Sequence, residues 1–73
     1  MSLVEARRTR IRWIKENIMD LEKIDPLFDR YNIARIRDRL LESGLYPAHQ
    51  RWIDETSVAS MVLAAQGKPT RRN

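Results

Sequence analysis

Apolar residues in the first third of the chain recur at spacings of three, four and seven residues. The residues of this stripe are Val4, Ile11, Ile14, Ile18 and Leu21. Such spacings place side chains on one face of an α-helix. Ser2 and Glu5 form a capping-box pattern, which is typical of a helix start. The sequence therefore predicts a first helix that continues to about Lys23 or Ile24.

A second helix is predicted to begin at Asp25-Pro26 and to end at Ser43. Aspartate can accept hydrogen bonds from the first free amides, and proline needs no amide partner at the first helical position. Gly44 fits the left-handed position that often ends a helix. Asn32 is the one place where this helix could break. Its expected buried side consists of Leu27, Phe28, Tyr31, Ala34, Leu40 and Leu41.

Residues 48 to 66 suit a third helix that stops at Gly67, and Thr56-Ser57 could divide it into two. Its expected inward residues are Trp52, Ile53, Ala59, Val62 and Leu63. Residues 68 to 73 are polar and basic, and we expect a disordered tail there. With no strand-like alternation, the prediction is an all-α domain over residues 1–67, built from three helices or four.

Composition narrows the class of protein. The chain has 73 residues, 42% of them hydrophobic, and no cysteine. The absence of cysteine excludes a disulfide-stapled module and most zinc folds. No apolar run approaches the ~20 residues that cross a bilayer, and arginines occupy the place of a signal peptide's apolar stretch. We therefore expect a cytoplasmic protein.

The basic residues are concentrated in two blocks. Fourteen Lys and Arg against ten Asp and Glu give a net charge of +4, which favours an acidic protein surface or nucleic acid as partner. Residues 1 to 15 and 30 to 39 are the basic blocks, and an antiparallel hairpin would bring both to one pole. The candidate partner-binding residues are Arg7, Arg8, Arg10, Arg12, Trp13, Arg35, Arg37 and Arg39.

Two alternatives stay open for these features. Trp13 either anchors an interface among the arginines or borders the core. The first helix could also pair antiparallel with a second copy, which would set its basic half against the acidic half of its partner. Monomer and homodimer are therefore both compatible with the sequence, and a purely structural helical oligomer is a further hypothesis.

The segment from 24 to 42 is similar to a helix-turn-helix, with a turn at 32 to 33 and a basic recognition helix over 35 to 41. Two residues depart from that pattern. Phe28 falls where those motifs hold a small residue, and Asp38 falls where they bury an aliphatic one. The alternative function that this segment suggests is a small, dimeric DNA-binding repressor.

Catalytic chemistry has little support in the sequence. The single histidine, His49, has no sequence-visible acid partner, and Asp54-Glu55 would diverge by about 100° on a helix. Gly44 and Gly67 fall at helix ends, so no phosphate-cradling loop is expected. We predict a protein that is not an enzyme and that has no cofactor and no metal site.

An arginine-rich start leads a single helical domain of this size, with the sequence Val4-Glu5-Ala6-Arg7-Arg8-Thr9-Arg10. Over its whole length the chain resembles the small RNA polymerase-binding transcription inhibitors and antiterminators of Xanthomonas bacteriophages. The resemblance implies a viral protein in the host cytoplasm that binds the amino-terminal region of the polymerase's largest subunit near the RNA exit channel. It also implies transcription regulation through inhibited initiation and suppressed termination, with possible RNA or DNA phosphate contact through the arginines.

Overall fold

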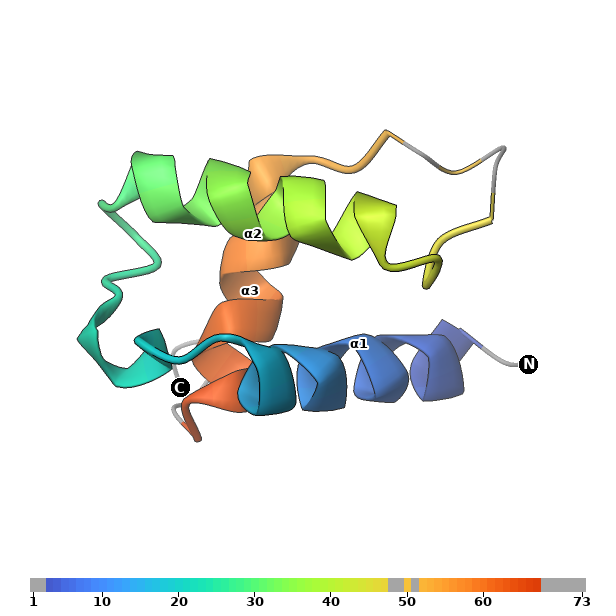
Figure 1. Cartoon of the computed structure of the whole chain (residues 1–73), viewed down its shortest axis with the longest axis horizontal. Helices are drawn as coiled ribbons and strands as arrows, with labels where there is room; N and C mark the ends of the chain where they lie inside the picture. The colour runs from blue at the N-terminus through green and yellow to red at the C-terminus, as the bar shows by residue number, and fades with distance from the viewer. Residues whose placement is uncertain (1–2, 48–49, 51, 68–73) are drawn as a thin grey trace.

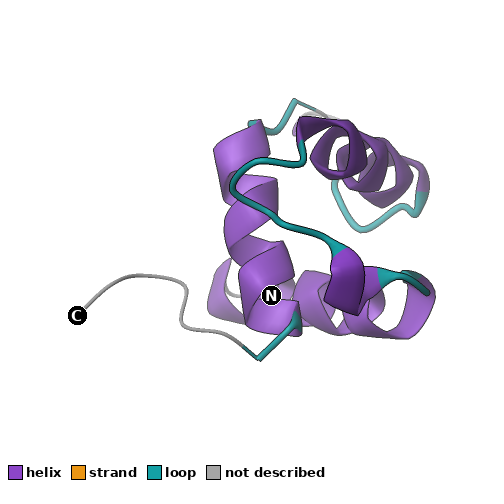
Figure 2. Cartoon of the chain, turned by 90° about the vertical axis from the view of Figure 1, so that its left-hand side faces the viewer, coloured by secondary structure: helices purple, strands orange, loops and turns teal. Residues whose placement is uncertain are grey.

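The computed structural model describes residues 3–47, 50 and 52–67, and every regular element in them is helical (Figure 2). The elements are α1 (Leu3–Asn17), the short 3-10 helix η1 (Leu21–Lys23), α2 (Arg30–Glu42) and α3 (Glu55–Ala65). The all-α fold class is therefore confirmed. The Ser2 cap, His49 and the 68 to 73 tail lie outside the described residues.

The three α-helices form two layers. α1 and α2 lie side by side and run in opposite directions, and α3 crosses behind both of them (Figure 1). α3 packs against α1 and against α2, whereas α1 and α2 make few direct backbone contacts with each other. The third helix thus joins the first two into one unit. The described helices are too short or too polar to span a bilayer.

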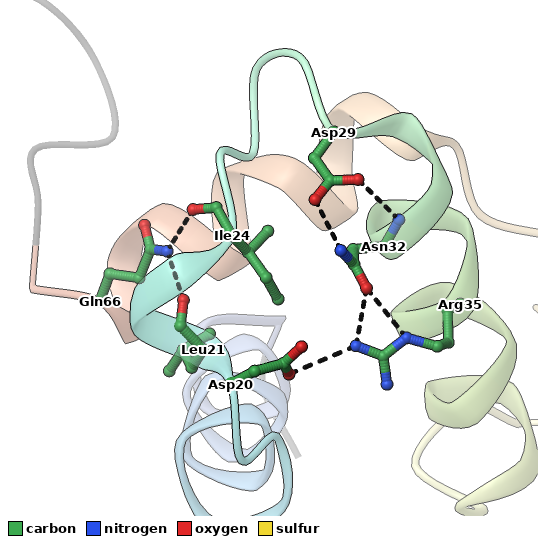
Figure 3. Close-up of polar contacts among 7 residues, drawn as sticks. All are labelled: Asp20, Leu21, Ile24, Asp29, Asn32, Arg35 and Gln66. Carbon is green, nitrogen blue, oxygen red and sulfur yellow. Dashed lines mark hydrogen bonds and ion pairs between the residues drawn. The ribbon is translucent and has the colours of Figure 1, made fainter.

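α1 is shorter than the hydrophobic stripe predicts. It ends at Asn17 and not at Lys23 or Ile24, and the chain continues through a turn into η1. The carbonyl oxygens of Leu21 and Ile24 both accept a hydrogen bond from the Gln66 side-chain nitrogen, at 2.7 and 2.9 Å (Figure 3). Because the residue that caps the end of α3 supplies this partner, these carbonyls are satisfied without a continuous helix.

α2 begins later than predicted. Asp25 closes only one turn, in which its backbone oxygen accepts from Phe28 N at 3.1 Å and Asp29 N at 2.8 Å. Asp29 is the true cap: its carboxylate accepts from Asn32 N at 3.2 Å and from Asn32 Nδ2 at 2.6 Å. The break that Asn32 allowed does not occur, because this residue completes the cap and α2 continues through it.

The late start of α2 changes which side chains face inward. Leu27, Phe28 and Tyr31 were expected on the buried side, and all three are exposed. Residues 26 to 28 form a turn, so the helical period that placed Leu27 and Phe28 inward does not apply to them. Leu40 is fully buried as expected, and Ala34 and Leu41 are half-buried.

The glycine stops are confirmed, but the start of the third helix is not where it was expected. Gly44 and Gly67 have φ angles of +84° and +79° just beyond α2 and α3, a conformation that glycine adopts without a Cβ clash. α3 begins at Glu55 because Asp54 Oδ1 accepts from Thr56 N at 2.6 Å and from Ser57 N at 3.2 Å. Thr56 and Ser57 therefore start the helix and do not divide it.

The core lies where η1 and the three helices meet, and within the described residues it is wholly apolar. Its members are Ile14, Ile18, Leu21, Ile24, Ile33, Ile36, Leu40, Val58, Met61, Val62 and Ala65. Ile53 and Ala59 are half-buried and pack against it, and Leu63 is half-buried. Trp52 was predicted to point inward but is 80% exposed, because residues 52 to 54 are not helical and α3 begins only at Glu55.

Candidate interaction surface

The antiparallel pair sets the basic start of α1 beside the end of α2. Arg39 of α2 lies over the Trp13 ring of α1, with 5.5 Å between the guanidinium carbon and the ring centroid. Arg10 of α1 lies over the Tyr46 ring at 3.6 Å. We name Arg10, Trp13, Arg39 and Tyr46 the arginine–aromatic cluster, since each guanidinium is within cation–π distance of a ring.

Arg10 is fixed more firmly than Arg39. Its Nε and Nη2 donate to the Leu45 carbonyl oxygen at 3.3 and 3.0 Å. Arg39 is exposed, and its one described side-chain contact is the Trp13 ring. All five N–H donors of Arg39 are thus available to a carboxylate or a phosphate.

The rings of Trp13 and Tyr46 are held in place by contacts with the hydrophobic core. Trp13 and Tyr46 are half-buried and pack against the core, so Trp13 both borders the core and carries an arginine on its ring. Burial raises the pKa of the Tyr46 hydroxyl, and the neighbouring Arg10 charge lowers it in part. Tyr46 therefore stays neutral at physiological pH, and the cluster keeps the positive charge of its two arginines.

The turn after α2 places Tyr46. Ser43 Oγ donates to Leu40 O at 2.6 Å and accepts from Leu45 N at 3.2 Å. These two hydrogen bonds and the left-handed conformation of Gly44 fold Leu45 and Tyr46 back toward α1. Tyr46 is the functional candidate that the sequence did not reveal, and its signal was an aromatic residue two positions after a helix-ending glycine.

Two other predicted binding arginines are held in different places. Arg7 donates to Ser60 Oγ of α3 at 2.9 Å. Arg35 contacts Asn32 Oδ1 at 2.8 Å and Asp20 Oδ1 at 3.4 Å, near the start of α2 (Figure 3). These contacts hold elements of the fold together.

Arg37 is also separate from the cluster. Its Nη2 lies 3.6 Å from Asp38 Oδ1, about a third of its side chain is exposed, and its Nε is buried with no hydrogen-bond partner. Arg37 and Arg39 are two residues apart, which is about 200° around the helix axis. They therefore occupy different sides of α2.

Arg8 and Arg12 lie on yet another side of α1. Both are exposed, and together with Ile11, Lys15 and Glu16 they line a shallow hollow. The structure thus brings only Arg10, Trp13 and Arg39 of the predicted site residues into one cluster. The other five lie outside it.

The predicted helix-turn-helix arrangement is wrong in this segment. Residues 32 and 33 lie inside α2, so no turn separates a first helix from a recognition helix. Asp38, which that pattern would bury, is exposed. The helix that crosses the pair, α3, contains no lysine or arginine and contributes four residues to the core, which leaves it without the basic face of a recognition helix.

Among the described residues, no group of three His, Asp or Glu side chains is placed to hold a metal ion. Comparison with protein-family models, with curated proteins and with solved structures finds no match to this chain.

Proposed function

We propose that the protein is a non-enzymatic regulator of transcription that binds bacterial RNA polymerase through the arginine–aromatic cluster. The observation that carries the proposal is the exposed Arg39 guanidinium over the Trp13 ring. Arginine and tryptophan are enriched among the residues that dominate binding energy at protein interfaces. The resemblance noted from the sequence supplies the polymerase as the partner.

An acidic protein surface fits this cluster better than a nucleic acid does. The rings of Trp13 and Tyr46 each carry a guanidinium and pack against the core, so they offer little free face on which a base could stack. Asp38 and Glu42 are exposed on the same helix as Arg39, and they would repel a continuous phosphate backbone. A single carboxylate that meets Arg39 avoids that repulsion.

The mechanism we propose is occupation of a surface. Arg39 forms a two-pronged hydrogen-bonded pair with a polymerase carboxylate, and Trp13 packs beside it. Bound near the RNA exit channel of the largest subunit, the protein inhibits promoter initiation and suppresses termination. No chemical step on a substrate is required.

Transcription from a promoter through a terminator with purified bacterial RNA polymerase tests the proposal. The native protein should lower the promoter-dependent yield and increase terminator read-through, and Arg39→Glu should abolish both effects. Arg30→Glu is the matched control, because its side chain is 87% exposed at the other end of α2 and, among the described residues, pairs only with Glu55, at 3.9 Å.

The DNA-binding alternative predicts a different outcome. Duplex DNA would then bind without polymerase, with an affinity that falls at a log-log slope of about −0.9 per neutralised phosphate as salt rises. The proposed function would be contradicted if the protein bound duplex DNA in this way and left transcription by purified RNA polymerase unchanged.

A further inference from the structure

The side of α1 that carries Arg8 and Arg12 has a second, separate charged surface. Three cations on this side are spaced four and three residues apart, so their side chains form a row along the helix. They are Arg8, Arg12 and Lys15. Val4, which is 60% exposed, and the half-buried Ile11 lie beside this row. We name these five residues the outer cationic face.

The cations of the outer cationic face have no partner in the described part of the chain. No ion pair or hydrogen bond joins the side chains of Arg8, Arg12 or Lys15 to a described residue. Arg7 and Arg10, on the same helix, are both held by hydrogen bonds. Like charges three and four residues apart weaken a helix, so the row does not stabilise α1.

Charge and shape together indicate the occupant. Arg8, Ile11, Arg12, Lys15 and Glu16 surround a hollow of about 420 Å³, in which cations border an apolar floor. We propose that the outer cationic face binds an acidic amphipathic helix of a partner protein. Carboxylates one turn apart on that helix pair with Arg8, Arg12 and Lys15, and an apolar side chain between them covers Ile11.

Two other occupants fit this face less well. A nucleic acid strand would leave the apolar side chains of Val4 and Ile11 uncovered. It would also find no aromatic ring on which its bases could stack, because the rings of the arginine–aromatic cluster belong to a different surface. A second copy that packed this face against its own would oppose cation to cation. The acidic half expected for such a pairing is not part of α1, which ends at Asn17 before Asp20 and Glu22.

This inference is independent of the proposed function, because it uses none of the residues of the arginine–aromatic cluster. If both hold, α1 is bound on two sides, and the protein connects an acidic surface to an acidic helix. Loss of one activity by substitution should then leave the other intact.

Binding of a labelled synthetic helix, followed by fluorescence anisotropy, tests the proposal with the full chain. The probe is about 20 residues long, so that it can form a helix, with glutamates at positions i, i+4 and i+7 and leucines between them. We expect Arg8→Glu/Arg12→Glu to weaken binding by about tenfold or more. A matched double variant, Lys23→Glu/Arg30→Glu, should change it by no more than about twofold, because both side chains are exposed and belong to neither surface.

Several results would overturn the inference. One is that the native protein does not bind the probe. Another is that both double variants lose affinity equally, which would show a response to net charge alone. A third is that a peptide of the same composition, with its glutamates scattered around the helix, binds as well as the probe. A fourth is that single-stranded RNA binds in a way that depends on Arg8 and Arg12 while the peptide does not bind.

A second substitution keeps the test decisive if the charge-reversed protein does not fold, which circular dichroism would show. Val4→Ala removes exposed apolar surface and no charge. It should weaken probe binding by about three- to tenfold, because the two methyl groups that it removes would be partly or fully covered in the contact. Unchanged affinity for Val4→Ala would contradict the apolar part of the proposal.

Discussion

α1, with 15 residues, and α3, with 11, have opposite distributions of charge and burial. α1 carries five cations, and Ile14 is its only fully buried side chain among those described. α3 has Glu55 as its single charged residue and buries Val58, Met61, Val62 and Ala65. α3 also contacts both other helices, whereas α1 contacts mainly α3.

This difference separates stability from binding. Folding of so short a chain depends on the apolar surface that it buries, and α3 supplies the central part of that surface. The charged sides of α1 are free to meet partners because the core does not need them. Substitutions in α3 should therefore unfold the protein, and substitutions on the exposed sides of α1 should change only what it binds.

The largest effect is expected from Met61→Ala in α3. Met61 is 2% exposed in the core, and removing such a side chain leaves a cavity that costs about 2–5 kcal/mol of unfolding free energy. Urea denaturation followed by circular dichroism measures this cost. A loss below about 1 kcal/mol would contradict the central place of α3 in the core.

Gln66→Ala should have the next largest effect. Its side-chain nitrogen is the hydrogen-bond donor shared by the carbonyls of Leu21 and Ile24, and these would lose a partner in a half-buried place. We expect a loss of about 1–3 kcal/mol in the same urea experiment. Gln50→Ala is the control, since Gln50 is an exposed glutamine, and it should leave the midpoint almost unchanged.

How far the sequence predicts this fold depends on whether the signal is local. The apolar period located Ile14, Ile18 and Leu21 in the core, and Gly44 located the end of α2. The start of α2 was missed because Asp25 and Asp29 can both cap a helix. The choice between them depends on the second hydrogen bond, from Asn32 Nδ2 to Asp29 Oδ2.

The candidate site was predictable only in part. The expected antiparallel hairpin correctly placed the start of α1 beside the end of α2. Rotation of about 100° per residue also puts Arg12 some 200° away from Arg10, so their separation onto different sides could have been worked out from the sequence. The contact of Tyr46 with Arg10 could not, because it depends on the path of the chain after Gly44.

A smaller, pH-dependent effect is expected at the start of α2. Hydrogen bonds from the Asn32 side chain and backbone lower the pKa of Asp29 below its usual 3.8. The ionised carboxylate therefore stabilises the folded state above that pH, and this contribution is lost as the pH falls through the lowered value. Asp29→Asn should remove this part of the acid sensitivity and still cap the helix.

Thermal unfolding of the native protein and Asp29→Asn between neutral pH and about pH 2 measures this difference. Asp38→Asn is the matched control, because it removes a carboxylate from the same helix without removing a cap hydrogen bond. Parallel pH profiles for the native protein and Asp29→Asn would contradict the role assigned to the cap.

The smallest effect on stability is expected from Arg8→Glu/Arg12→Glu on α1. Both side chains are exposed and unpaired within the described residues, so the unfolding free energy should change by no more than about 0.5 kcal/mol per substitution. Urea denaturation would show this directly. A loss as large as that of Met61→Ala would remove the distinction between the two helices.

The affinity of purified bacterial RNA polymerase for the native protein, Arg39→Glu and Arg30→Glu tests the central claim most directly. The two variants make the same change of charge on the same helix, and their thermal unfolding should match that of the native protein. Our account predicts that Arg39→Glu weakens binding by about tenfold or more and that Arg30→Glu changes it by less than about twofold. Equal affinity of all three proteins, or no binding by the native protein, would contradict it.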